Sequence, residues 1–256
     1  MKIIVALKQV PVRDSSVSID ARGKWFDERD LSYEINEPDA YALEAALLLK
    51  DKHGGEVVVL CAGPDRAASS IREALAKGAD RAIHVACDDL PGLDSLTVAR
   101  RLAAAAAPEK ADLILTGLQS DDLGLGQTGV VVADSLGIPH ATIIMEIEKR
   151  DGSVRVKREL EDGWFQWVEL PLPALLTIQS GLSRLRYATL MGIKKAKNKE
   201  IRRLSAQQLP AARPAPVSLY RVYAPPRKKG AHMIGGSATE AATKLAEILK
   251  FEVRVL

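Results

Sequence analysis

The chain has 256 residues, of which 36 are basic and 33 acidic, giving a formal net charge of +3. Hydrophobic residues make up 47% and charged residues 27% of the sequence, a composition typical of folded proteins in water that argues against a disordered or membrane-spanning chain. The small net charge argues against a protein that coats nucleic acid along its whole length.

The first half of the chain alternates short apolar segments with segments of helical periodicity. The patterns predict strands at 2–7, 57–62, 82–85 and 113–116, and helices at 39–53, 65–77, 94–107 and 127–136. Apolar strands that alternate with helices are typical of a parallel sheet covered on both faces, because each strand is buried twice. We therefore predict an α/β fold with a doubly wound, mostly parallel, Rossmann-like sheet.

The pattern changes after Pro139. Three strands are predicted at 141–150, 153–160 and 164–170, joined by Asp-Gly pairs that favour hairpin turns, so we expect an antiparallel hairpin extension. A buried strand is predicted at 175–179. The proline-rich segment 209–230 predicts an extended C-terminal arm, which is followed by a helix at 239–250 and a strand-like tail at 252–256.

The positive charge is concentrated in residues 184–203, called here the basic segment. This segment holds eight of the 36 basic residues but only one of the 33 acidic residues, which leaves 28 basic and 32 acidic residues, a net −4, elsewhere. Such a segment is either a docking surface for a partner or a solvated face that touches RNA. It has no interleaved aromatic residue beyond Tyr187, which weakens the RNA interpretation.

No side chains follow a metal-binding or nucleophilic pattern. The four histidines lack metal-ligand spacing, and no G-x-S-x-G, Walker lysine or S-x-x-K motif occurs. Cys61 and Cys87 lie far apart, as in proteins of a reducing compartment. The apolar run at 3–7 is too short for a signal peptide or a membrane span. We therefore expect no metal, no catalytic residue, no membrane span and a cytoplasmic location.

A glycine-rich loop, residues 117–129, follows the fourth predicted strand. Residues 124–129 match the G-x-G-x-x-G pattern of dinucleotide-binding loops. In that motif, however, the loop follows the first strand of the sheet, and here it follows the fourth. Its glycines allow backbone N–H groups to approach a phosphate at a helix N-terminus, where Gln127 and Thr128 can donate. Asp121 and Asp122 suit a ribose or an adenine edge better than a phosphate. These residues alone leave nucleotide binding and an ordinary capped loop equally open.

A second loop, residues 34–39, leads into the first predicted helix. Helix capping alone explains its asparagine, proline and aspartate. Because the carboxyl ends of parallel strands converge on one crevice, this loop, the loop at 62–64 and the glycine-rich loop are expected to meet at one edge of the sheet.

Five motifs together resemble one family. They are Lys8-Gln9-Val10-Pro11, the run from Asn36 to Glu44, the run from Ala74 to Arg81, the loop from Gln119 to Gly129, and the run from Arg186 to Lys197. In this order they resemble the β subunit of electron transfer flavoprotein. The resemblance implies a heterodimer with an α subunit that holds most of an FAD, an AMP buried in β, and no catalytic residue in β. It implies electron transfer from flavoprotein dehydrogenases, such as the acyl-CoA dehydrogenases of fatty acid oxidation, to a membrane quinone oxidoreductase or another acceptor.

The resemblance also assigns site residues. It places AMP against Ala6, Asn36, Glu37, Pro38, Asp39, Ala62, Leu118, Gln119, Ser120, Asp121, Asp122, Leu123, Gly124, Leu125, Gly126, Gln127, Thr128 and Gly129. It makes Leu190 the apolar anchor of a loop that docks the dehydrogenase, with neighbours Arg186, Tyr187, Ala188, Thr189, Met191, Lys194 and Lys195. A single exposed leucine surrounded by charged residues fits this role. The charges guide the approach of the two proteins, and burial of the apolar side chain determines how long they stay bound.

The implied organisation is a nucleotide-binding domain over 1–204, including the hairpin extension 141–170 and the docking loop 184–203, and an arm over 205–256 that packs on the α subunit. Three other interpretations remain. One is an electron-bifurcating β subunit with a second FAD in place of AMP, although the Gln127-Thr128-Gly129 run favours AMP. The others are an ATP-using enzyme, for which Lys8 supplies a lysine without a glycine loop, and a stand-alone nucleotide-binding module.

Overall fold

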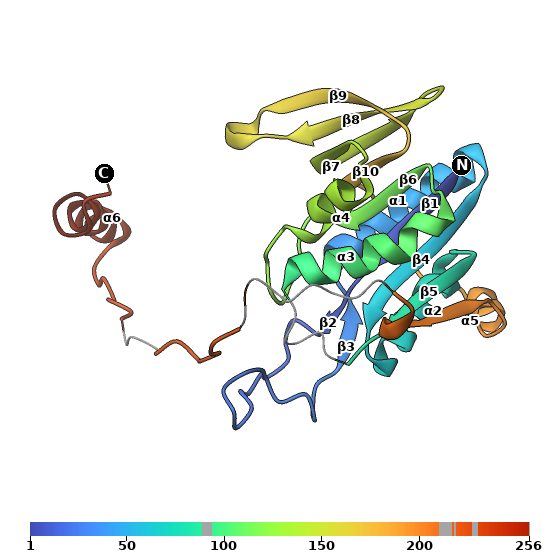
Figure 1. Ribbon diagram of the computed structural model, residues 1–256. Helices are drawn as coiled ribbons and strands as arrows, with labels where there is room; N and C mark the ends of the chain where they lie inside the picture. The colour runs from blue at the N-terminus through green and yellow to red at the C-terminus, as the bar shows by residue number, and fades with distance from the viewer. Residues whose placement is uncertain (89–93, 210–216, 218, 227–229, 256) are drawn as a thin grey trace. The chain divides into compact units, whose positions relative to one another are not determined.

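The computed structural model describes residues 1–88, 94–209, 217, 219–226 and 230–255. It divides the chain into two compact units, Met1–Val222 and Tyr223–Leu256. Figure 1 shows the elements of both units. Parts of the predicted arm, residues 210–216, 218 and 227–229, lie outside the described residues.

A large sheet runs through the first unit (Figure 1). Within the described residues it has nine strands in the order β11-β5-β4-β1-β6-β10-β7-β8-β9. The strands are β1 (Lys2–Leu7), β4 (Glu56–Gly63), β5 (Arg81–Ala86), β6 (Leu113–Gly117), β7 (His140–Lys149), β8 (Ser153–Glu159), β9 (Phe165–Pro171), β10 (Ala174–Ile178) and β11 (Ile201–Ser205). Neighbouring strands from β11 to β7 pair in parallel, and β7, β8 and β9 pair antiparallel. The predicted mostly parallel sheet with an antiparallel extension is confirmed.

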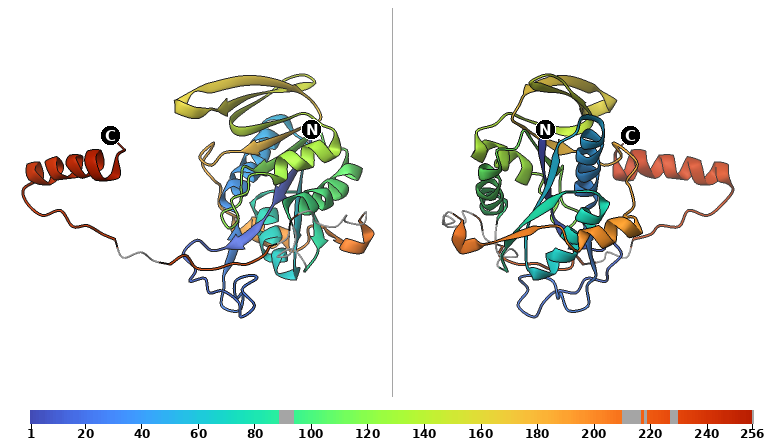
Figure 2. Two further views of the ribbon diagram at one scale, coloured as in Figure 1. Left: turned by 60° about the vertical axis from the view of Figure 1, so that its left-hand side comes forward. Right: turned by 90° about the vertical axis from the view of Figure 1, so that its right-hand side faces the viewer.

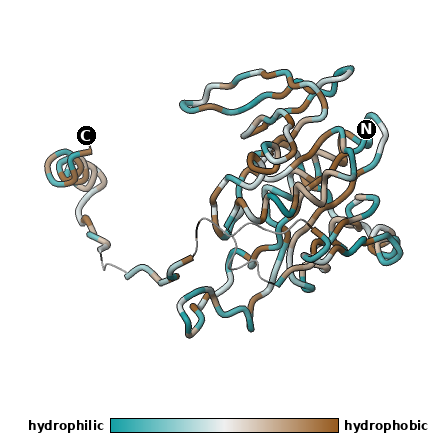
Figure 3. Tube along the Cα trace, in the orientation of Figure 1, coloured by the Kyte–Doolittle hydropathy of each residue, from teal (hydrophilic) through white to brown (hydrophobic). Residues whose placement is uncertain are grey.

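Helices cover both faces of this sheet (Figure 2). They are α1 (Glu37–His53), α2 (Ala68–Lys77), α3 (Ser95–Ala106), α4 (Thr128–Leu136) and the short α5 (Leu190–Ala196). On β1, Ile3 and Val5 belong to the apolar cluster that contains residues of α1 and α2. Ile4 belongs to the opposite cluster, with residues of α3 and α4. Successive side chains of one strand thus enter two cores, which explains why the central strands are apolar at nearly every position (Figure 3).

The chain's second half returns into the sheet. The segment predicted as a buried strand at 175–179 forms β10, which lies between β6 and β7. At the second predicted hairpin turn, Asp162 and Gly163 both have positive φ, 57° and 76°, as the Asp-Gly pair predicts.

The structure adds elements that the sequence patterns do not predict. Strands β2 (Gln9–Pro11) and β3 (Tyr33–Ile35) form a small antiparallel sheet of their own. Part of the basic segment forms β11, which pairs with β5 at the edge of the large sheet. Two of its five residues, Ile201 and Leu204, are apolar and pack partly buried against the two cores, and this short pattern is too weak to predict a strand.

Two predictions about helix ends and tails are wrong. The helix predicted over 65–77 begins at Ala68, and Asp65 lies in a preceding 3-10 turn (Asp65–Ala67) without a capping hydrogen bond; its carboxylate accepts a hydrogen bond from Arg203. Of the tail predicted as a strand at 252–256, Glu252 and Val253 belong to a π-helical turn, Ile248–Val253, that continues helix α6 (Ala238–Glu247). Residues 254 and 255 have no regular structure, and residue 256 lies outside the described residues. Alternation of apolar and charged residues there mimics the period of a strand.

Candidate functional site

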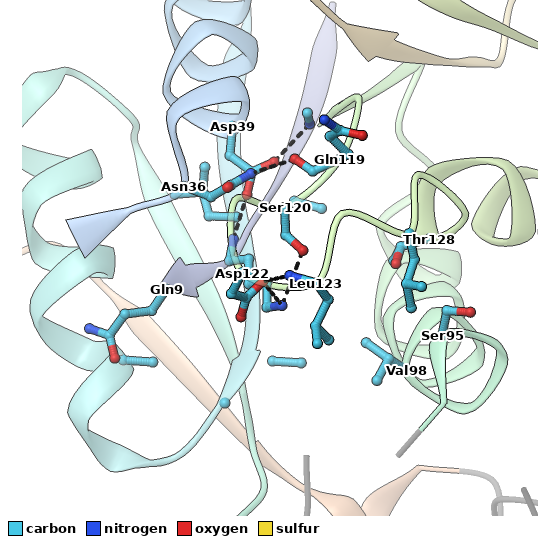
Figure 4. A pocket seen from close by; sticks show the side chains of 18 of the residues that line it. Gln9, Asn36, Asp39, Ser95, Val98, Gln119, Ser120, Asp122, Leu123 and Thr128 are labelled. Carbon is cyan, nitrogen blue, oxygen red and sulfur yellow. Dashed lines mark hydrogen bonds and ion pairs between the residues drawn. The ribbon is translucent and has the colours of Figure 1, made fainter. Parts of the chain in front are cut away.

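A pocket with a cavity volume of about 390 Å³ lies at the carboxyl ends of β1, β4 and β6 (Figure 4). It brings together residues from all three loops that the sequence predicts to meet. The predicted residues in its lining are Ala6, Asn36, Asp39, Ala62, Leu118, Gln119, Ser120, Asp122, Leu123, Leu125, Gly126, Gln127, Thr128 and Gly129. The predicted residues Glu37, Pro38, Asp121 and Gly124 are not part of the lining.

Asn36 fixes the start of the glycine-rich loop. Its side-chain Nδ2 donates to the carbonyl of Gln119 at 2.9 Å, and its Oδ1 accepts from the N–H of Asp121 at 2.9 Å. The residue is 1% exposed. Although Asn36 is the N-cap of α1, its side chain makes no capping bond. The Asn36 side chain therefore fixes the glycine-rich loop at the pocket edge and does not cap α1.

Asp39 connects the ends of two neighbouring strands. Its carboxylate accepts hydrogen bonds from the backbone N–H groups of Lys8, at 2.7 Å, and Gly117, at 2.8 Å. Gly117 lies so close that a Cβ there would approach Asp39 Oδ1 to 2.5 Å and Pro38 Cβ to 2.7 Å. The first turn of α1 thus joins β1 to β6 directly beneath the pocket.

Burial raises the pKa of Asp39 from 3.8 to about 7, against the opposing effect of the two N–H donors. A carboxyl whose folded-state pKa lies above its unfolded value costs stability as pH rises between the two values, because the unfolded chain ionises first. We expect the wild-type free energy of unfolding to fall between about pH 4 and pH 7 more steeply than that of Asp39→Asn, by up to about 4 kcal/mol at pH 7. Urea unfolding of both proteins across this range measures the difference; parallel pH profiles would contradict it.

The lysine in the pocket is already paired. Lys8 Nζ lies 2.6 Å from Asp122 Oδ1 and 3.3 Å from Ser120 Oγ. Because this ammonium is held by the glycine-rich loop, it is not available as a free phosphate-gripping group. The arrangement weakens the interpretation as an ATP-using enzyme.

Two helices begin at the opposite side of the pocket, where Ser95 and Thr128 lie (Figure 4). Ser95, the first residue of α3, donates its hydroxyl to Gln127 Oε1 at 2.6 Å. Gly129, in the first turn of α4, packs so closely that a Cβ would lie 2.6 Å from Thr116 Oγ1. The N-terminus of α4 is thus seated against β6, with its unpaired N–H groups near the cavity, an environment that favours an anion.

One wall of the pocket is formed by residues that no sequence motif predicts. Its lining there consists of Gln9, Pro11, Trp25, Phe26, Glu28, Tyr33 and Arg66. Trp25 and Phe26 stack with ring centroids 4.4 Å apart, and the Arg66 guanidinium lies 4.0 Å from the Tyr33 ring centroid. The only sequence signal for this wall is a pair of adjacent aromatic residues within an otherwise polar stretch.

The predicted docking residues lie on a different surface. Thr189 caps α5 by accepting from the N–H of Gly192 at 3.0 Å, so the segment predicted as a loop contains a short helix. Leu190 and Tyr187 are both 88% exposed, and Met191 is 61% exposed. Beneath them Ala196 is buried, and a Cβ on Gly192 would meet the carbonyl oxygen of Ala76 at 2.3 Å. Helix α5 therefore packs tightly on α2 while it presents an apolar tip to solvent.

Half of the basic segment is bound within the chain. Arg186 Nε lies 3.0 Å from a Glu44 carboxylate oxygen, and its NH2 group lies 2.9 Å from Asp51. Other cations of the segment bind acceptors on the body: Lys199 donates to the carbonyl of Leu75, Arg202 to Glu109, and Arg203 to Asp65. Among the described residues, Lys194, Lys195 and Lys197 form no ion pair. The free positive charge near Leu190 is therefore smaller than the sequence count suggests.

The chain matches the family model described as "Electron transfer flavoprotein domain" over residues 24–209. It is 39% identical, over 97% of its length and 98% of the relative's, to the electron transfer flavoprotein subunit beta of Methylophilus methylotrophus. The chain belongs to the electron transfer flavoprotein β-subunit family. It is also 32% identical to the subunit beta of Bacillus subtilis, over the full length of both chains. A further relative is the caffeyl-CoA reductase-Etf complex subunit CarD of Acetobacterium woodii, 34% identical over 98% of each chain.

Electron transfer flavoprotein β subunits pair with an α subunit and take part in flavin-linked electron transfer. In the part of this β subunit that the structure describes, no cluster of three or more His, Cys, Asp or Glu side chains suits a metal ion. Nor does any helix of the described ranges have the length and apolarity to cross a membrane. Cys61 and Cys87 are both buried, and burial raises the pKa of the Cys61 thiol to about 12.

Proposed function

We propose that this β subunit binds AMP in the pocket, helps to enclose an FAD held mainly by the α subunit, and docks flavoprotein dehydrogenases through Leu190. One observation carries the nucleotide assignment. The glycine-rich loop, fixed by Asn36 and Lys8, leads into the N-terminus of α4 at the edge of a pocket that lies at the carboxyl ends of three parallel strands. Nucleotides bind at this edge in open α/β sheets.

The charges of the pocket favour a monophosphate. Its two lining cations are both engaged by carboxylates, Lys8 by Asp122 at 2.6 Å and Arg66 by Glu28 at 3.0 Å. Asp39 and Asp88 add acidic groups to the lining. A triphosphate would bring four negative charges to a site whose described lining residues include no free cation, whereas one phosphate can be held by the N–H groups of α4 and the hydroxyl of Thr128.

The β subunit needs no acid, base or nucleophile for this role. The FAD of the complex supplies the redox chemistry, and the residues of β position and enclose it. A nucleotide bound only by the folded state also stabilises the subunit by mass action. Of the predicted C-terminal arm, residues 205–256, the part that follows Val222 packs on the α subunit, because residues 219–222 contact residues 23 and 24 of this chain. Nucleic acid is not a partner.

Helix α5 supports the docking assignment. The exposed side chains of Tyr187, Leu190 and Met191 lie near Lys194 and Lys195 of the last turn of α5, which form no ion pair with any residue that the structure describes. Apolar anchors within a charged rim are typical of transient electron-transfer contacts, in which charge governs encounter. The electrons then pass from the complex to a quinone oxidoreductase or another acceptor. We place this carrier in the cytoplasm.

A second candidate is a β subunit that holds a second FAD in place of AMP. The aromatic wall formed by Trp25, Phe26 and Tyr33 favours it, since the pocket continues past the nucleotide loops toward these rings.

Co-purification with the α subunit tests both proposals. We expect a yellow heterodimer that releases one AMP and one FAD per β chain on denaturation, as measured by chromatography of the released nucleotides. Two FAD and no AMP would favour the second candidate. A β chain that does not associate with the α subunit would contradict both and favour a stand-alone nucleotide-binding module.

A further inference from the structure

The segment between β2 and β3 has no core of its own. No residue from Pro11 to Glu34 is buried. Within it, Ile19 and Phe26 form an antiparallel bridge, Asp20 N–H donates to the Trp25 carbonyl at 2.8 Å, and Gly23 turns the chain with a φ of 64°. We call residues 19–26 the aromatic hairpin. A hairpin this small is marginal in water, so its position depends on contacts at its two sides.

One side of the aromatic hairpin forms the pocket wall. Trp25 and Phe26 both line the cavity. The Trp25 indole N–H donates to Glu28 at 3.1 Å, and Glu28 pairs with Arg66 at 3.0 Å. Arg66 NH1 in turn donates to Gln9 Oε1 at 2.9 Å. This chain of contacts fixes the two rings relative to β2 and to the start of α2.

The other side of the hairpin holds residues 219–222, far away in the sequence. The backbone N–H of Val222 donates to the carbonyl of Gly23 at 2.8 Å. Lys24 Nζ donates to the carbonyl oxygens of Leu219 and Tyr220 and lies 5.3 Å from the centroid of the Tyr220 ring. These residues are the last of the first compact unit, which ends at Val222.

We infer that Lys24 is a positioning residue for the nucleotide pocket, and that occupancy of the pocket and seating of residues 219–222 on the aromatic hairpin stabilise each other. The inference rests on the proposed nucleotide site. A nucleotide that packs against Trp25 and Phe26 reduces the motion of the hairpin. Residues 219–222 then bind to Lys24 and the Gly23 carbonyl with a smaller loss of conformational entropy, because the hairpin is already ordered. Thermodynamic linkage then requires the reverse effect to be equally large.

Equilibrium dialysis with labelled AMP on the α–β complex tests one direction. Lys24→Met keeps the length of the side chain and removes its three N–H donors. We expect the variant to bind AMP about fivefold more weakly or worse, and Lys24→Arg to restore binding. The matched control is Arg22→Met, in the same hairpin, because the Arg22 side chain is 83% exposed and pairs with Asp20 alone. An AMP Kd for Lys24→Met within twofold of the parent would overturn the inference.

Hydrogen exchange tests the other direction. Adding AMP to the parent complex is expected to slow exchange of the Val222 amide about fivefold or more, and to have a smaller effect in Lys24→Met. Equal Val222 exchange with and without AMP would overturn the linkage. If the parent binds no AMP, the proposed function fails, and the positioning role is judged without nucleotide: faster exchange of the Asp20 and Asp27 amides in Lys24→Met supports it, and unchanged exchange overturns it.

Discussion

Replacing Leu190 with alanine is expected to slow electron acceptance from a partner dehydrogenase about 30-fold while the flavin content of the complex stays unchanged. The side chain is 88% exposed at the start of α5, so it has little role in folding. A buried anchor residue at the centre of an interface contributes about 2 kcal/mol or more, which corresponds to this factor. The rate of flavin reduction by a limiting amount of dehydrogenase, followed by absorbance, measures the effect.

Val17 provides the matched control. It is an apolar residue, 53% exposed, in the segment between β2 and β3 rather than on α5. Val17→Ala removes exposed apolar surface without altering the tip of α5 and is expected to leave the rate within twofold of the parent. If Leu190→Ala accepts electrons as fast as the parent does, α5 is not the docking surface.

Replacing Asn36 with leucine, which has the same number and branching of side-chain heavy atoms, is expected to weaken AMP binding about 10- to 100-fold and to lower the free energy of unfolding by about 1–3 kcal/mol. The substitution removes two hydrogen bonds of a buried amide side chain, one donated to the carbonyl of Gln119 and one accepted from the N–H of Asp121. Each hydrogen bond within a protein contributes about 0.5–1.5 kcal/mol to stability. Equilibrium dialysis and urea unfolding measure the two effects separately.

Glu37→Gln serves as the control for this prediction. Glu37 is adjacent in the sequence, but its side chain is 48% exposed and pairs with Arg13 outside the pocket lining. We expect normal AMP binding and stability for this variant. Unaltered AMP affinity in Asn36→Leu would show that the Asn36 contacts do not shape the binding site.

The convergence of the three loops could be predicted from the sequence because buried parallel strands are apolar at nearly every position, which is a distinctive sequence pattern. Residues such as Ile4, Val58 and Ile114 are apolar where a surface strand would be polar, which shows that the sheet is covered on both faces. Once the strands are parallel, their following loops must lie at one edge. The pocket residues at 36–39 and 118–129 follow from that rule combined with the family resemblance.

The roles of Asn36 and Asp39 could not be predicted in the same way. Both residue types are common helix caps, so their sequence context points to α1 itself. Their actual partners, the backbone of residues 8, 117, 119 and 121, lie on other loops. The aromatic wall was missed because the stretch from Pro11 to Glu34 buries no residue and therefore has no periodic pattern.

Strand β11 has a consequence for the docking role that we propose for α5. The chain leaves β10 inside the sheet, forms α5, and is paired again at the far edge through β11, so the short helix is held at both ends by the same sheet. A contact surface that is already rigid loses little conformational freedom when it binds. A carrier that visits one protein to load and another to unload benefits from such a surface, since a small apolar tip can be recognised quickly and then released without any segment having to refold.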